Sequence, residues 1–189
     1  MKKPMIFLLV LCLSVSGCIT WVKVGGPCDM RSENFTVELP DGWRRHAATN
    51  RVIITKEGID LQTIMIFRTP IDKKLPFTQK KISTDMLPQE VAEVVIDDLK
   101  SNQAISNVMV VENDPAQLSG QQGFKITYTF QTKAGLNKKG VYYGLLTGNW
   151  LYSLVYMAPQ RYYFDKDLHT FENIVPSFKI VDLHTGKIV

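Results

Sequence analysis

The strongest constraint on the fold is a strict alternation of apolar and polar residues over residues 124–131, within the segment 121–133. One set of alternate positions is apolar: Phe124, Ile126, Tyr128 and Phe130. The other set is polar: Lys125, Thr127, Thr129 and Gln131. Because successive side chains of a β-strand point to opposite faces, this pattern predicts a strand with one buried and one solvent-facing side. Such a strand needs neighbours, so the chain must build a sheet.

The same period of two recurs along much of the chain. It predicts further strands at residues 34–39, 51–56, 60–68, 108–111, 139–147 and 150–157. Turn-forming residues stand between them: Pro40-Asp41-Gly42, Glu57-Gly58, Asn113-Asp114-Pro115 and Gly148-Asn149. In residues 150–157 both sets of alternate positions are mostly apolar, so we expect this strand in the interior of the sheet.

Two segments change to helical spacing. After Pro88 the apolar residues are Val91, Val94, Val95 and Leu99. Before Pro176 they are Phe164, Leu168, Phe171 and Ile174. Residues 69–87 contain prolines and two lysine pairs and predict a long loop, a candidate functional segment. Since helices come singly between groups of strands, we expect the α+β class, with a mainly antiparallel β-sheet flanked by helices.

The N-terminus has the layout of a secretory signal peptide. Lys2 and Lys3 precede an apolar run over residues 5–15, and small residues follow it. The four residues VSGC, ending at Cys18, resemble the bacterial lipobox. The resemblance implies that residues 1–17 are removed and that Cys18 becomes the lipidated first residue. An ordinary cleaved signal, or an uncleaved anchor over residues 5–22, is the alternative.

The rest of the chain divides simply. Gly25-Gly26-Pro27 lies within residues 18–32, which we expect to form the lipidated N-terminus and a tether, followed by a single domain over 33–189. Ile19 rather than aspartate after the lipidated cysteine resembles cargo of the outer membrane, facing the periplasm, if the envelope is Gram-negative. Cys28 is then the one cysteine left unmodified, either unpaired or bridged to another chain.

Charge argues against nucleic acid as a partner. Removing residues 1–17 takes away Lys2 and Lys3 and no acid, so the formal net charge falls from +4 to +2. Basic residues gather in two short groups that could bind a partner. They are Trp43, Arg44, Arg45 and His46, and Lys73, Lys74, Lys80 and Lys81. Alternatively, both groups are solvated surface, with Trp43 a core residue.

No motif predicts a reaction. GxSxG, HExxH, the P-loop and GxGxxG are absent from the sequence, and His46, His169 and His184 stand far apart. We therefore predict no catalytic residue, no metal and no cofactor. Asp97-Asp98 reads as a solvated helix face. The aromatic C-terminal half could line a sugar or peptide groove, although strand spacing favours a place in the sheet core: Tyr142, Tyr143, Trp150, Tyr152, Tyr156, Tyr162 and Tyr163.

The order of elements resembles a known family. It runs from FTVELPDGW through MLPQE, PAQLSGQQGFKITYTF and WLYSLVYMAP to FENIVPSF. This order is similar to the Mog1/PsbP-like fold, an α/β/α sandwich, over about residues 33–180, and especially to its small bacterial envelope lipoproteins. The resemblance implies a scaffold that binds a protein partner, because Mog1 binds a small GTPase and PsbP binds a photosystem.

These observations together predict a membrane-anchored envelope lipoprotein that acts as a non-enzymatic protein-binding or assembly-accessory module. Its partners would be the membrane, through lipid on Cys18, and an envelope protein. The alternative is a hydrolase, or a sugar-binding or small-ligand-binding protein, that uses the aromatic-rich C-terminal half.

Overall fold

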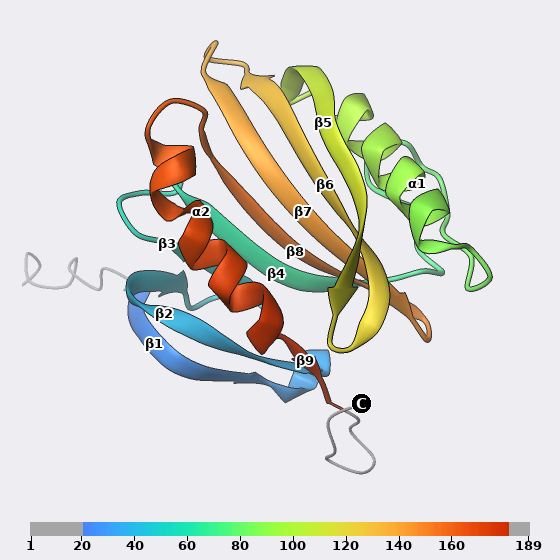
Figure 1. Ribbon diagram of the computed structural model, residues 1–189, viewed down its shortest axis with the longest axis horizontal. Helices are drawn as coiled ribbons and strands as arrows, with labels where there is room; N and C mark the ends of the chain where they lie inside the picture. The colour runs from blue at the N-terminus through green and yellow to red at the C-terminus, as the bar shows by residue number, and fades with distance from the viewer. Residues whose placement is uncertain (1–20, 182–189) are drawn as a thin grey trace, which may run out of the picture.

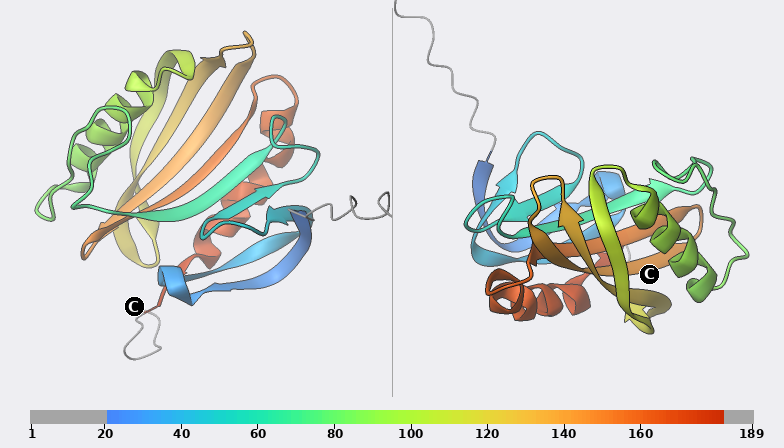
Figure 2. Two further views of the ribbon diagram at one scale, coloured as in Figure 1. Left: turned by 180° about the vertical axis from the view of Figure 1, so that it is seen from behind. Right: turned by 90° about the horizontal axis from the view of Figure 1, so that it is seen from above.

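Nine strands of the chain join in one antiparallel sheet, with a helix on each face (Figures 1 and 2). The computed structural model describes residues 21–181. The strands are β1 (Trp21–Met30), β2 (Phe35–His46), β3 (Val52–Thr55), β4 (Thr63–Pro70), β5 (Ile105–Leu118), β6 (Gln121–Thr132), β7 (Asn137–Thr147), β8 (Trp150–Pro159) and β9 (Lys179–Ile180). The helices are α1 (Pro88–Ser101) and α2 (Tyr163–Ile174), with 3-10 turns at Arg31–Glu33 and Val175–Ser177. The expected α+β class and antiparallel sheet are confirmed.

The strands lie in the order β1-β2-β3-β4-β8-β7-β6-β5, with β9 beside β2. Strand β8 therefore lies between β4 and β7, as its two apolar faces predict. The strand predicted at residues 121–133 is β6, and both predicted helices are present. The turn at Gly148-Asn149 joins β7 to β8, and Gly148 has the positive φ of 55° that such a turn requires.

Each helix covers its own hydrophobic core. Helix α1 packs its buried residues Val91, Ala92, Val95 and Ile96 against the apolar face of β6 and against β7 and β8. Helix α2 covers the opposite face, where its Phe164 and Phe171 meet residues of β2, β4, β7 and β8. The sheet is thus the middle layer of an α/β/α sandwich, and Figure 2 shows the two helices on its two sides.

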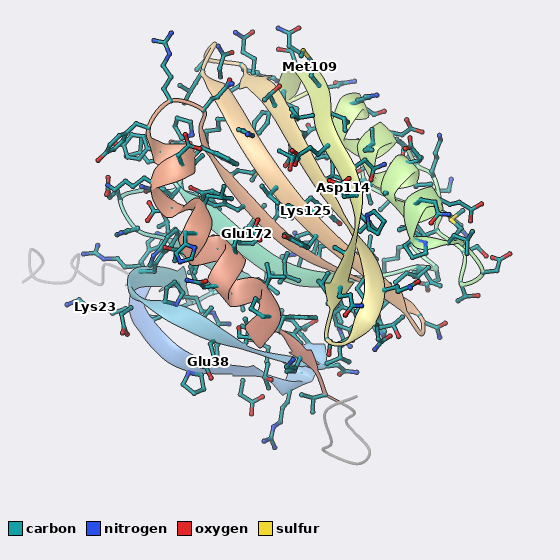
Figure 3. All side chains as sticks on the ribbon, viewed as in Figure 1. Lys23, Glu38, Met109, Asp114, Lys125 and Glu172 are labelled. Carbon is teal, nitrogen blue, oxygen red and sulfur yellow. The ribbon has the colours of Figure 1, made fainter. Side chains whose placement is uncertain are left out.

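Polar contacts also hold α2 to the sheet. Lys125 of β6 lies beside Glu172 of α2 in Figure 3, with 2.9 Å between Lys125 Nζ and Glu172 Oε1. The hydroxyl of Tyr143 donates to Glu172 Oε2 at 2.7 Å. Burial raises the pKa of Tyr143 to about 12, so its phenol stays protonated at neutral pH and keeps this bond.

The expected tether is wrong for most of its length. Residues Trp21–Met30 form β1, which pairs with β2 from the Trp21–His46 pair to the Met30–Phe35 pair. The glycines and proline mark a bulge at the sheet edge, where three residues of β2, 40–42, lie opposite Gly25. The domain therefore includes residues 21–32 and does not begin at residue 33.

Two of the expected turns are also wrong. Residues 40–42 form this bulge within β2, and Gly42, its last residue, has a φ of 78°. Asn113-Asp114-Pro115 lies inside β5, a single strand of 14 residues. Proline is tolerated there because β5 is the last strand of the sheet. At an outward-facing edge, the backbone N–H that proline lacks is not needed for pairing with another strand.

The proposed signal peptide and Cys18 lie outside the described residues, so the lipobox stays a prediction. Among the described residues, those of the buried core fall between Met30 and Val181. Within residues 21–181 no helix is long and apolar enough to cross a membrane.

Candidate functional site

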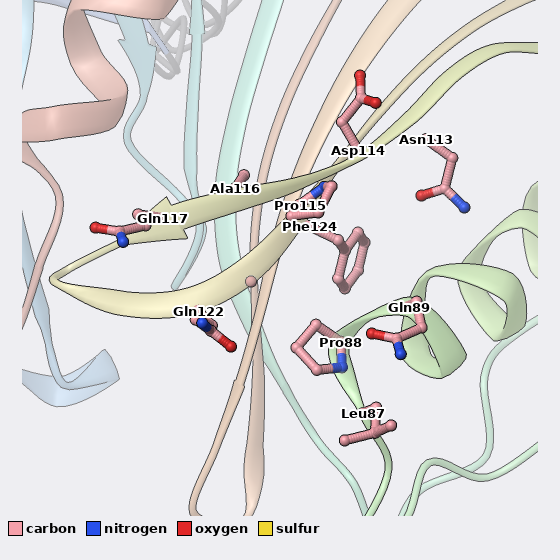
Figure 4. Close-up of a pocket in the computed structure, with 11 residues that line it drawn as sticks. Leu87, Pro88, Gln89, Asn113, Asp114, Pro115, Ala116, Gln117, Gln122 and Phe124 are labelled. Carbon is pink, nitrogen blue, oxygen red and sulfur yellow. The ribbon is translucent and has the colours of Figure 1, made fainter.

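A cleft of about 630 Å³ opens between the start of α1 and the β5–β6 hairpin (Figure 4). Its lining residues come from three elements that are far apart in the sequence: Leu87, Pro88 and Gln89; Asn113, Asp114, Pro115, Ala116 and Gln117; Gln122, Gly123 and Phe124. The cleft is therefore a product of the fold, and no local motif marks it.

The lower wall of the cleft in Figure 4 is the first turn of α1. Pro88 stands at the first helical position, where its missing N–H is not needed. The Glu90 carboxylate accepts a hydrogen bond from Leu87 N at 2.7 Å, which fixes this end of the helix. The Leu87 side chain is left 54% exposed at the mouth of the cleft.

The upper wall is the hairpin. Phe124 of β6 and Pro115 of β5 are paired across the two strands and lie above Pro88 in Figure 4. Gly123 is required beside them, because a Cβ there would lie 2.3 Å from the carbonyl oxygen of Gly144 on β7. This close approach of β6 and β7 brings the wall together.

Most of the residues that line the cleft are uncharged. Its surface is apolar, from Leu87, Pro88, Pro115 and Phe124, with the side-chain amides of Gln89 and Gln122 beside it. Asp114 is the one charged residue among those that line it, and its carboxylate points away from α1 in Figure 4. This surface therefore fits a ligand group that is apolar and that also forms hydrogen bonds with side-chain amides.

Strand β5 adds an open edge beside the cleft. It pairs with β6 alone among the described strands, so its outer edge has no strand partner there. Two apolar side chains of β5 are exposed, Met109 at 64% and Val111 at 53%. Register shifts near both of them interrupt the edge, so the regular part of β5 is its second half, which lines the cleft.

Solved structures share this architecture at low sequence identity. Cyanobacterial PsbP (CyanoP) from Synechocystis sp. PCC 6803 has a TM-score of 0.56 and 14% identity, over 91% of this chain and 98% of that one. The Saccharomyces cerevisiae Ran-binding protein Mog1p has a TM-score of 0.56 and 11% identity, over 88% and 100%. The chain has the Mog1/PsbP-like fold.

A third structure with this fold is LpqN of Mycobacterium tuberculosis, described as involved in cell envelope biogenesis. Its TM-score is 0.51 and its identity 14%, over 82% of this chain and 86% of LpqN. No protein family matches the sequence, and no curated protein does either. At these identities the likeness establishes the Mog1/PsbP-like fold alone.

The first predicted basic group divides between core and surface of the Mog1/PsbP-like domain. Trp43 is only 1% exposed and packs in the α2 core, so its candidate role in partner binding is wrong, and it is a core residue. Arg44 is exposed on the other face of β2. Arg45 lies against sulfur, with Nη2 at 3.0 Å from Met30 Sδ and Nη1 at 3.5 Å from Cys28 Sγ.

His46 ends β2 and meets Trp21 edge-on, with 5.1 Å between ring centroids. Sequence reasoning missed Trp21 and Lys23 because it placed them in a tether. The signal was present: in TWVKV the residues alternate, and Trp21 and Lys23 fall on one side of a strand. Cys28, also in β1, is a free cysteine, and burial raises the pKa of its thiol.

The second predicted basic group lies on the loop between β4 and α1. Lys73, Lys74 and Lys81 are exposed, and Lys80 Nζ is paired with Asp97 Oδ2 at 2.6 Å. This loop follows the end of β4, whereas Arg44 and Arg45 pair with β3 near the opposite end. The fold therefore does not bring the two basic groups together.

Asp98 holds this loop on α1, so the solvated-face interpretation of Asp97-Asp98 is incomplete. Its Oδ1 accepts hydrogen bonds from Phe77 N and Thr78 N, both at 2.9 Å, and from the Thr78 hydroxyl at 3.2 Å. Two backbone donors of a long loop thus depend on a single carboxylate.

We expect Asp98→Ala to lower the free energy of unfolding by about 1 to 2 kcal/mol, because two backbone donors lose a charged acceptor. Amide hydrogen exchange at Phe77 and Thr78 should become faster, which can be followed by NMR. Asp97→Ala is the matched control, since it removes only an exposed ion pair and should change stability by about 0.5 kcal/mol. Unchanged exchange at both amides in Asp98→Ala would contradict the assignment.

The aromatic residues of the C-terminal half divide between the core and the surface, where Trp150 lines a second cleft of about 790 Å³ with Pro70, Ile71 and Lys81. Tyr142, Tyr143, Tyr152 and Tyr156 are buried between strand and helix, which confirms their interpretation as sheet core. Within residues 21–181 no three His, Cys, Asp or Glu side chains gather in a way that could hold a metal ion.

Proposed function

We propose that this protein is a lipid-anchored accessory protein of the bacterial cell envelope that binds a partner protein and catalyses no reaction itself. In this proposal, acyl chains on Cys18 hold it in the outer membrane, facing the periplasm. The Mog1/PsbP-like domain binds the partner through the cleft between α1 and the β5–β6 hairpin.

The neutral, apolar cleft beside an open strand edge is the observation that carries this proposal. Asp114 is the only titratable group among its lining residues, and it points away, so the cleft offers no acid–base pair and no nucleophile. Amides both donate and accept hydrogen bonds, as does an extended backbone. The occupant that fits is therefore an uncharged, extended segment of a partner protein with one apolar side chain in the cleft.

The fold neighbours are compatible with this role. Mog1p is named a Ran-binding protein, and LpqN is described as involved in cell envelope biogenesis. The proposal brings these two properties together for this chain, as protein binding in the envelope. The alternative of a sugar site built on the aromatic half has less support, because four of its tyrosines lie in the core.

Site-specific photocrosslinking in native cells tests the cleft. A photoreactive phenylalanine derivative replaces Gln117 in the full-length protein, and the matched control replaces Gln160, an exposed glutamine that follows β8. We expect a discrete crosslinked protein from position 117 and none from position 160. Adding Leu87→Asp and Gln122→Lys should reduce that product on the order of 10-fold, because burying an unpaired charge opposes binding.

The melting temperature of the Leu87→Asp, Gln122→Lys variant serves as the folding control, because both positions are exposed. Equal products from positions 117 and 160, or a product that the added charges leave unchanged, would refute the cleft as the binding surface.

A further inference from the structure

The open end of the β1–β2 hairpin carries a group of basic and aromatic side chains that the proposed partner site does not use. We name it the basic end and define it as Trp21, Lys23, Arg44, His46 and Arg51. We infer that the basic end docks on anionic lipid headgroups, so that the domain lies directly against the membrane. The lipid anchor in this picture rests on the proposed function, whereas the docking surface is argued from the described residues.

The basic end contains two like charges held side by side. Lys23 and Arg44 are directly opposite each other in the register of β1 and β2, and both are exposed. Like charges in this position destabilise a sheet unless an anion lies near them. Neither side chain makes a hydrogen bond or ion pair with any described residue. Figure 3 shows Lys23 pointing away from the domain at this end of the hairpin.

All five residues lie on one face of the sheet. Trp21 and His46 are the next pair along the ladder from Lys23 and Arg44, two positions further on each strand. Arg44 also pairs with Thr55 of β3, and Arg51 precedes Thr55 by four positions on that side. The Arg51 guanidinium lies over the ring of Phe67, with its carbon 4.8 Å from the ring centroid. Strand alternation therefore points these side chains in the same direction.

The aromatic members suit an interface between lipid and water. Trp21 and His46 are both partly exposed, and their ring planes meet at 87°. Nδ1 of His46 has no hydrogen-bond partner among the described residues. An indole beside basic side chains is typical of protein surfaces at the headgroup level, where its apolar ring and its polar N–H are both satisfied.

The acidic residues near the turn of the same hairpin are paired with arginines. Asp29 pairs with Arg31 at 2.8 Å, and Glu33 pairs with Arg68 at 3.1 Å. Glu38 is exposed midway along β2, well away from Lys23 in Figure 3. Asp41 is exposed beside Gly25, between Glu38 and the basic end. The basic end carries the three cations Lys23, Arg44 and Arg51, whereas the acids at the turn are neutralised by arginines, and this difference would orient the hairpin toward an anionic surface.

The position of the basic end selects lipid as the anion. Two residues, Ile19 and Thr20, separate Trp21 from Cys18, and the three extended Cα-to-Cα steps from Cys18 to Trp21 span at most about 11 Å. That reach is comparable to the screening length of about 8 Å at physiological ionic strength, so charges of the bilayer surface act on Lys23. From Trp21 onward, the residues expected to form a tether form strand β1 instead. This leaves no spacer long enough to hold the domain away from the membrane.

Vesicle binding of the unacylated chain, residues 19–189, tests the inference without the anchor, because this chain keeps all of the core residues that the structure describes. We expect it to sediment with vesicles of phosphatidylglycerol and phosphatidylcholine, not with phosphatidylcholine alone, and to be released at about 1 M salt. Replacing Lys23, Arg44 and Arg51 by glutamine should weaken binding on the order of 100-fold, since each charge contributes a factor of about 5.

Lys73→Gln, Lys74→Gln and Lys81→Gln together form the matched control, because they remove the same charge from exposed positions on the distant loop. They should change binding by less than about 3-fold. Equal binding to both kinds of vesicle, or an equal loss in the control, would overturn the inference. Neither result depends on acylation of Cys18, so failure of docking and failure of the proposed anchor are told apart.

Discussion

Replacing Asp167 of α2 by alanine is expected to lower the free energy of unfolding by about 3 kcal/mol, as measured by urea denaturation. Asp167 is 1% exposed, and both of its carboxylate oxygens are used. Oδ1 lies 3.2 Å from Lys56 Nζ, and Oδ2 accepts a hydrogen bond from Gln62 Nε2 at 2.9 Å. Removing the carboxylate leaves a buried amide without an acceptor and an ammonium group without its counter-ion.

The loss should be large because Gln62 is itself completely buried and organises the β3–β4 connection. Its Oε1 accepts from Glu57 N at 3.2 Å, and its backbone oxygen accepts from the Thr55 hydroxyl at 2.6 Å. Asp167 therefore joins α2 to this connection through a chain of buried polar groups, in which each depends on the next.

Two further variants separate this network from a general effect of removing an acid. Asp167→Asn keeps the size and one acceptor oxygen and should lose about half as much stability. Asp72→Ala, at an exposed loop position, should change it by less than about 0.5 kcal/mol. If Asp167→Ala lay within about 1 kcal/mol of the wild type, the network would not have the structural role assigned to it.

Gly144→Ala is expected to cost about 2 to 3 kcal/mol, because the new methyl group would enter an occupied space. A Cβ at Gly144 would lie 2.1 Å from Phe124 Cζ. The Phe124 ring has little room to move, since it stacks on Tyr142 with 5.9 Å between centroids and 4° between planes. Overpacking here would also disturb Phe124 as a wall of the cleft.

A double-mutant cycle with Phe124→Ala measures this contact. Phe124→Ala alone should cost about 3 to 5 kcal/mol by opening a cavity in the α1 core. The double variant should be more stable than the sum of the two losses by at least about 1 kcal/mol, because the clash disappears with the ring. Additive losses would mean that the two residues do not compete for the same space.

Gly148→Asn is the matched glycine control. Gly148 has a φ of 55°, a conformation that asparagine tolerates, and a Cβ there would meet nothing within 4 Å. We expect this variant to stay within about 1 kcal/mol of the wild type. Comparing Gly144→Ala with Gly148→Asn distinguishes a glycine that is required because a side chain would not fit from one that is required for its backbone conformation.

Regular patterns made much of the fold predictable. Residues 124–131 alternate between apolar and polar side chains, and residues 150–157 are mostly apolar at both sets of alternate positions. Both segments are strands, β6 and β8, and β8 lies inside the sheet as predicted. The two helices follow from their apolar spacing. In these segments the buried side chains recur at a regular spacing, so the sequence of each segment alone is enough to predict its secondary structure.

The same reasoning did not predict the β-bulges. Gly25-Gly26-Pro27 and Pro40-Asp41-Gly42 have the composition of a linker and a turn. In the structure Gly25 lies opposite residues 40–42 in the β1–β2 ladder, and Gly26 and Pro27 continue the pairing. Only the partner strand distinguishes a bulge from a break, and a single sequence does not contain the pairing. The tether was wrongly predicted for this reason, and with it the position of Trp21 and Lys23.

The candidate sites were less predictable than the fold. The cleft joins residues 87–89 to residues 113–124 through the packing of α1 on the sheet, and no motif marks either segment. Arg44 and His46 were found from residue type alone. Trp43 was grouped with them by proximity, although alternation along β2 turns it inward.

The measurement that tests the central claim most directly is the intact mass of the protein extracted from native membranes, with its N-terminal peptide fragmented. The account predicts a chain that begins at Cys18 and carries acyl groups on that residue. A chain that retains Met1, or that begins at Ile19 or later, without acyl groups would contradict the lipid anchor.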